Sequence, residues 1–156
     1  MLDLFDEFKK LTARFAERKI DYALCGGLAL AVYGIPRATI DIGLMILPES
    51  LEKVQKLVRK LGYIKEAMPM RFAEREIEIR RISKFDRESG DMLSLDLLKV
   101  TPALLTVWKT RKEVAWENGT LWVVSRDGLI TLKSMRGSGQ DLDDIRRLKE
   151  ENVDER

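Results

Sequence analysis

Apolar residues recur every three to four positions in the first part of the chain. The members of this series are Leu4, Phe5, Phe8, Leu11, Phe15 and Ile20. Such spacing places the side chains on one face of a helix, so the pattern predicts an amphipathic helix over residues 3–18. The apolar run that follows, residues 22–25, predicts a short buried strand.

The next segment changes from small residues to an alternating pattern. Residues 27–33 are small and apolar, and they predict a short, tightly packed helix that Gly34 and Pro36 bring to an end. Residues 39–46 predict a strand because Ile42 and Leu44 alternate with Asp41 and Gly43. One face of this strand is therefore apolar, and the other carries an acid and a glycine.

The remaining chain alternates between helical and strand patterns. Helical spacing occurs over residues 51–61, 102–108, 126–135 and 140–150, and strand patterns occur over residues 76–82, 92–100, 113–116 and 121–124. In the strand over 76–82, Ile77, Ile79 and Arg81 alternate with glutamate and arginine. Asn118-Gly119 is a strong signal for a two-residue hairpin. The order of elements predicts an α+β fold, with a mixed β-sheet flanked by helices and ending in C-terminal helices.

Composition limits the class of protein. A chain of 156 residues is most simply one domain, and we expect a single domain over residues 1–156. Hydrophobic content of 45% and charged content of 35% are typical of a globular protein, and the net charge of +2 gives no strong signal for nucleic-acid binding. No segment approaches the run of about 18 apolar residues that a membrane span requires.

Two residue counts exclude several chemistries. The sequence has no histidine, which excludes histidine acid–base catalysis, histidine metal ligands and Ser-His triads. Cys25 is the single cysteine, so no intrachain disulfide forms, and we expect it to be a small buried residue. Acids near the amino terminus do not suit a signal peptide, and a cytoplasmic location is the expectation.

The glycine pair Gly26-Gly27 lies between the first strand and the small helix. Without a Cβ, backbone at such a junction approaches a phosphate closely. The alternative is that the pair only permits a tight turn.

Asp41 and Asp96 each interrupt an apolar strand. Burying a lone carboxylate costs roughly several kcal/mol unless it is paired or bound to a metal. We therefore favour a functional role for Asp41 and Asp96, at a place where a metal ion could lie between the protein and a phosphate. The alternative is that each carboxylate reaches solvent or a nearby lysine.

Further polar residues suit a triphosphate. Arg37 and Thr39 share the strand face of Asp41, and Lys133 and Arg136 lie on a C-terminal helix. A guanidinium, a hydroxyl and an ammonium all bind phosphate oxygens, although each of these residues is also typical of a solvated surface. In the last helix, Asp141 is expected to cap the amino end and Asp144 to pair with a nearby cation.

Together these residues resemble the minimal nucleotidyltransferase-fold proteins of the polymerase-β superfamily. The resemblance covers nearly the whole chain and includes small prokaryotic members that are uncharacterised or related to toxin–antitoxin pairs. Two signatures carry it: Gly26-Gly27…Arg37-x-Thr39-x-Asp41-x-Gly43 and Leu129-Ile130-x-Leu132-Lys133…Arg136…Asp141-Leu142-x-Asp144-Ile145-x-x-Leu148.

The resemblance implies a reaction as well as a fold. Family members transfer a nucleoside monophosphate from an NTP to a hydroxyl or protein acceptor. By this resemblance Gly26 and Gly27 hold the triphosphate, and Asp41 and Asp96 hold Mg²⁺. Metal ions suit this chemistry because they neutralise phosphate charge and align the nucleophile with the leaving group.

Gly43 departs from the family pattern, which has Asp-x-Asp on this strand. Loss of one carboxylate weakens metal binding unless another acid, such as Glu78 or Asp91, replaces it. Two hypotheses follow. The first is a Mg²⁺-dependent nucleotidyltransferase with an altered metal site, and the second is an inactive nucleotide- or partner-binding member, for example of a toxin–antitoxin pair. A third alternative is a structural protein that no longer binds nucleotide.

Overall fold

The computed structural model of the chain describes residues 2–35, 41–74, 76–117 and 119–154, with side chains up to residue 150. Its strands are β1 (Ala23–Cys25), β2 (Asp41–Ile46), β3 (Lys65–Glu66), β4 (Met70–Phe72), β5 (Ile77–Phe85), β6 (Met92–Lys99), β7 (Lys112–Trp116) and β8 (Gly119–Val123). Its helices are α1 (Leu4–Glu17), α2 (Gly27–Val32), α3 (Leu51–Lys60), α4 (Leu105–Lys109), α5 (Arg126–Arg136) and α6 (Gly139–Asp154). Short 3₁₀ turns, η1 (Pro48–Ser50) and η2 (Pro102–Leu104), precede α3 and α4.

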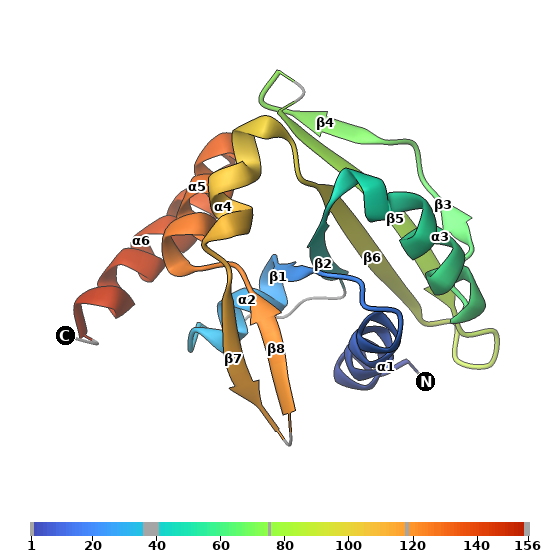
Figure 1. The fold of residues 1–156 in the computed structure, drawn as a ribbon. Helices are drawn as coiled ribbons and strands as arrows, with labels where there is room; N and C mark the ends of the chain where they lie inside the picture. The colour runs from blue at the N-terminus through green and yellow to red at the C-terminus, as the bar shows by residue number, and fades with distance from the viewer. Residues whose placement is uncertain (1, 36–40, 75, 118, 155–156) are drawn as a thin grey trace.

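One mixed sheet joins the described strands in the order β3-β5-β6-β2-β1-β8-β7, and β4 pairs with β5. The central strands β2 and β6 run parallel, whereas β1 with β2 and β5 with β6 are antiparallel. Figure 1 shows α3 at the end of the molecule where β5 and β6 lie, while α5 and α6 lie together at the other end. The predicted α+β fold with a mixed sheet and C-terminal helices is confirmed.

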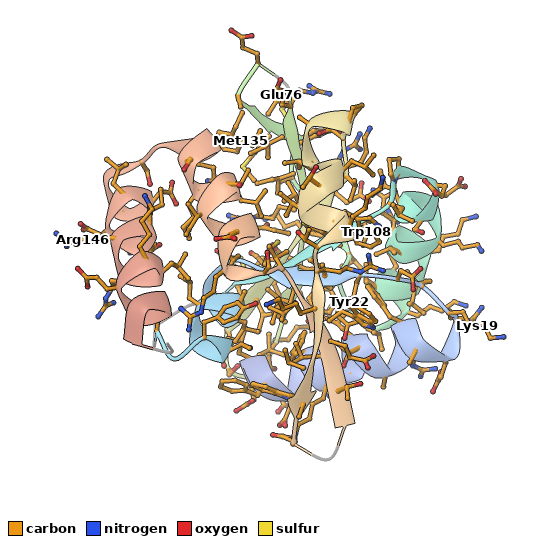
Figure 2. All side chains as sticks on the ribbon, turned by 60° about the vertical axis from the view of Figure 1, so that its left-hand side comes forward. Lys19, Tyr22, Glu76, Trp108, Met135 and Arg146 are labelled. Atoms are coloured by element: carbon orange, nitrogen blue, oxygen red, sulfur yellow. The ribbon has the colours of Figure 1, made fainter. Side chains whose placement is uncertain are left out.

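The core forms where the predicted apolar faces meet. On α1, Phe8, Leu11 and Phe15 are buried, and on β2 the alternating residues Ile42 and Leu44 are fully buried. In Figure 2, Tyr22 and Trp108 lie within the body of the molecule, whereas Lys19 and Arg146 point away from it. None of the helices in the described part of the chain has the length and apolar character needed to cross a membrane.

Several boundaries differ from the sequence pattern. The strand predicted over residues 76–82 continues to Phe85 as β5, because Lys84 points inwards and forms an ion pair with the buried Glu7, Nζ to Oε1 2.9 Å. A polar residue that would suit a loop is thus part of a strand. The predicted hairpin is confirmed by antiparallel pairing of β7 with β8. Residues 36–40, which include Arg37 and Thr39, lie outside the described residues.

Candidate functional site

The sheet register aligns four site residues in one row across neighbouring strands. Cys25 on β1 pairs with Gly43 on β2, Gly43 pairs with Asp96 on β6, and Asp96 pairs with Arg81 on β5. Cross-strand partners project from the same face of a sheet. Asp41 lies two residues before Gly43 and therefore shares this face. The fold thus brings the two predicted acids together, although about fifty residues separate them in the sequence.

Arg81 bridges the two acids. Its Nε–H donates to Asp96 Oδ1 at 2.7 Å, and its Nη2 donates to Asp96 Oδ2 at 3.0 Å and to Asp41 Oδ2 at 3.4 Å. The contact with Asp96 is the bidentate fork that gives arginine–carboxylate pairs their strength. The sequence pattern did not single out Arg81. The one indication in the sequence was that Arg81 continues the alternating series of Ile77 and Ile79. A charged residue on the same strand face as two apolar residues needs a partner.

The bridge shifts the pKa values of Asp41 and Arg81 for different physical reasons. The pKa of Asp41 is raised because burial disfavours its charged form and Asp96 adds repulsion, although Arg81 opposes both effects. The pKa of Arg81 is raised above its ordinary value, chiefly by its hydrogen bonds to Asp96. Arg81 is therefore a cation at neutral pH.

Gly26 lies next to Gly43, where β1 turns into α2. Gly26 precedes α2 with φ 79° and ψ −155°, a conformation that residues with a Cβ rarely adopt. A Cβ on Gly43 would lie 2.9 Å from the carbonyl oxygen of Cys25 and 3.3 Å from its Sγ. The β1–β2 pairing thus leaves no space for a side chain at Gly43, and an aspartate there would require the backbone to move.

A pocket of about 80 Å³ lies next to Asp96, between the sheet and α5. Its lining residues are Cys25, Gly26, Gly43, Ile77, Ile79, Asp96, Leu98, Leu129, Leu132, Lys133 and Arg136. The fold therefore brings Gly26, Asp96, Lys133 and Arg136 to one place, as members of a single site would be. Burial raises the pKa of the Cys25 thiol to about 12, so Cys25 is the buried and unreactive residue that was predicted.

Lys133 is engaged by acids of α6. Its Nζ lies 3.3 Å from Asp141 Oδ1 and 3.0 Å from Asp144 Oδ2, and all three residues are buried. Asp141 also accepts a hydrogen bond from the backbone N–H of Ser138, while the Ser138 hydroxyl accepts one from the Asp141 N–H. This reciprocal arrangement is a capping box, so the capping role of Asp141 and the cation pairing of Asp144 are confirmed.

Arg136 is more accessible than Lys133. Half of its side chain is exposed, its guanidinium stacks over Phe72 at 5.5 Å, and its Nε lies 4.0 Å from Asp141 Oδ2. Both residues line the pocket, but Arg136 is better placed to contact an incoming anion. Phosphate binding by either residue stays a prediction.

The acids as arranged do not fit a Mg²⁺ site. Mg²⁺ requires nearly octahedral oxygen ligands at about 2.0–2.1 Å and loses its water reluctantly. Within the described ranges, no group of three or more acidic or thiol residues is placed to hold a metal ion. Glu78 instead pairs with Arg71, Arg80 and Lys99. Asp91 accepts a hydrogen bond from the Leu2 N–H, so neither acid replaces the missing ligand.

Comparison with known proteins supports the fold. The chain matches no protein-family model and no curated protein. It is similar to the lincosamide antibiotic adenylyltransferase LnuA with lincomycin bound, at 17% identity and TM-score 0.58, over 92% of this chain and 95% of that one. It is also similar to ANT(2″)-Ia in complex with adenylyl-2″-tobramycin, at 13% identity and TM-score 0.62, over 95% and 92% of the two chains.

A third similar structure is a proposed nucleotidyltransferase from Thermotoga maritima. It is 12% identical, with a TM-score of 0.61 over 97% of this chain and 93% of that one. All three comparisons extend over nearly the full length of both chains, so the likeness includes the sheet and the C-terminal helices. The chain therefore has the nucleotidyltransferase fold.

Proposed function

We propose that the chain binds a nucleoside triphosphate at the β1–α2 turn but does not transfer its nucleoside monophosphate. Three features support binding. The fold is shared with the adenylyltransferase LnuA and with ANT(2″)-Ia in complex with adenylyl-2″-tobramycin. Gly26 provides a turn without a side chain at the amino end of α2, and Arg136 extends a cation to the edge of the adjoining pocket. The phosphates would lie along this turn, with Arg136 as their nearest accessible counter-charge.

The packing of Gly43 is the observation that favours binding without transfer. Phosphoryl-type transfer depends on cations held against the phosphates, and the cations depend on a sufficient set of carboxylates. Among the described residues, Asp41 and Asp96 are the acids on this face, and the space a third carboxylate would need at Gly43 is filled by the Cys25 carbonyl. The lack of a third carboxylate thus follows from the way β1 and β2 pair.

Transfer of a nucleoside monophosphate is the second candidate. The observation in its favour is that Asp41 and Asp96 meet on one face of the sheet beside the glycine turn. Mg²⁺ would then have to be held by these two acids, and the acceptor would be a hydroxyl or protein. A partner in a toxin–antitoxin pair remains a prediction from the resemblance.

Calorimetry combined with a transfer assay separates the candidates. We expect saturable heat on titration with ATP or another NTP, and no transfer of label from an α-labelled NTP with Mg²⁺ to acceptors in a lysate. Absence of heat with every NTP would contradict nucleotide binding. Label transfer that disappears in Asp96→Ala, but persists in Asp143→Ala on the exposed face of α6, would establish the second candidate.

Arg136→Gln tests where the phosphates bind. A hydrogen bond to a charged group contributes about 1.5–3 kcal/mol, so the substitution should weaken NTP binding roughly tenfold or more. Arg146→Gln is the matched control, because Arg146 is an exposed arginine on α6 that pairs only weakly with Asp143. Calorimetric affinities that fall equally in both variants would show that only overall charge matters.

A further inference from the structure

We propose that Arg81 is the built-in cation of the Asp41–Asp96 pair and excludes divalent metal ions from it in the nucleotide-free protein. The inference deepens the proposed function, and it rests on that proposal in taking this face of the sheet as the nucleotide site. It assigns a role to a residue that the sequence pattern did not single out.

The sheet itself places Arg81. Seven consecutive register pairs join β5 to β6, and Arg81 opposite Asp96 lies near the middle of this ladder. Side chains directly opposite each other in an antiparallel pair have Cβ atoms about 5 Å apart, so the guanidinium needs no long reach to meet the carboxylate. The bridge is a consequence of strand register rather than of a flexible surface contact.

The guanidinium occupies the position that a bridging metal would need. It donates to both oxygens of Asp96 and, through Nη2, to Oδ2 of Asp41, so one group joins the two carboxylates. Because both Asp96 oxygens accept from Arg81, a metal ion that bridged the acids would have to bind an Asp96 oxygen that the guanidinium already holds. Arg81 and a divalent cation therefore compete for Asp96.

Competition favours the arginine. A divalent cation would need to displace the bidentate fork and shed part of its hydration shell, and it would gain only two carboxylates in return. The guanidinium is not fully desolvated in this pairing, because the side chain of Arg81 is 36% exposed and that of Asp41 is 38% exposed. Arg81 is also tethered to the chain, so its local concentration beside the acids is high at any metal concentration.

Arg81 differs from the neighbouring arginines in the carboxylates with which it pairs. Arg71 on β4 forms its ion pair with Glu78, Nε to Oε1 3.2 Å, and Arg80 on β5 also pairs with Glu78. Both of these arginines thus pair with Glu78, whereas Arg81 pairs with Asp41 and Asp96. Arg71 therefore provides a matched control: an arginine in the same half of the sheet, paired with a carboxylate, outside the acid pair.

Mn²⁺ titration without nucleotide, followed by electron paramagnetic resonance of the free ion, tests the inference. Wild type and Arg71→Gln should show no saturable Mn²⁺ binding in the millimolar range. Arg81→Gln should bind Mn²⁺ roughly tenfold or more tightly than wild type, and Arg81→Gln combined with Asp96→Asn should lose that binding.

The opposite outcomes are equally clear. Saturable Mn²⁺ binding by wild type that is lost in Asp96→Asn would overturn the inference, as would an Arg81→Gln variant that binds no more tightly than wild type. Circular dichroism establishes that each variant is folded; if Arg81→Gln is not, Arg81→Lys keeps the charge without the fork and should bind Mn²⁺ more tightly than wild type. Because the assay contains no nucleotide, its result is independent of whether NTP binds.

Discussion

Gly43→Ala is expected to lower the free energy of unfolding by roughly 1–3 kcal/mol, the usual cost of overpacking a filled site. The new Cβ would lie 2.9 Å from the Cys25 carbonyl oxygen, and a backbone atom cannot move aside as a flexible side chain can. Relief requires β1 to move away from β2, which weakens their pairing at Cys25 and Gly43. Urea unfolding at neutral pH measures the effect.

Gly119→Ala is the control for this change. Gly119 also lies in a strand, but among the described residues no atom lies within 4 Å of the position that its Cβ would take. We expect its unfolding free energy to stay within about 0.5 kcal/mol of wild type. An equal loss in both variants would show that the general effect of alanine in a strand, rather than the Cys25 contact, is responsible.

Gly43→Asp extends the argument to function. It restores the carboxylate of the family pattern, but it adds a like charge directly opposite Asp96, which destabilises a strand pair further. We expect a larger loss of stability than in Gly43→Ala and no label transfer from an α-labelled NTP. A Gly43→Asp variant as stable as wild type that transfers label would show that the site opens readily, and would contradict the proposed explanation for binding without transfer.

The difference between Asp41 and Arg81 shows how far the sequence could predict the site. Both acids were identifiable because each interrupts an apolar strand, and the resemblance to a known fold implied that they meet. Arg81 was not identifiable, because alternation gives the face of a residue but not its partner on another strand. That partner depends on the β5–β6 register, which is set by packing of the whole sheet.

Gly43 and Lys133 show the same limit. The sequence shows that Gly43 lacks a carboxylate, but the contact with the Cys25 carbonyl that closes the position depends on how β1 and β2 pair. Lys133 was a reasonable phosphate ligand from its helix and its charge. The packing of α5 against α6 determines that Asp141 and Asp144 reach it first.

Lys133→Met is expected to lower the free energy of unfolding by about 3–5 kcal/mol, the cost of breaking a buried ion pair from one side. Methionine preserves most of the side-chain volume but removes the ammonium group that contacts the buried carboxylates of Asp141 and Asp144. Lys149→Met, at an exposed position of α6, the helix that carries both acids, should change stability by no more than about 0.5 kcal/mol.

The pH dependence of this loss identifies its cause. Burial alone would raise the pKa of Asp141, but the Ser138 hydrogen bonds and the charges of Lys133 and Arg136 outweigh it and hold that pKa below the ordinary value. In wild type the carboxylate therefore contributes stability above its unfolded-state pKa, and this contribution is lost as pH falls through the lowered folded-state pKa. In Lys133→Met the Asp141 carboxylate lacks the charge of Lys133, so its protonation costs less stability than in wild type. The difference in unfolding free energy between wild type and variant should narrow as pH falls from 7 towards about 3. A difference that stays constant over this range would mean that Lys133 stabilises the helix pair through packing of its carbon chain and not through its charge.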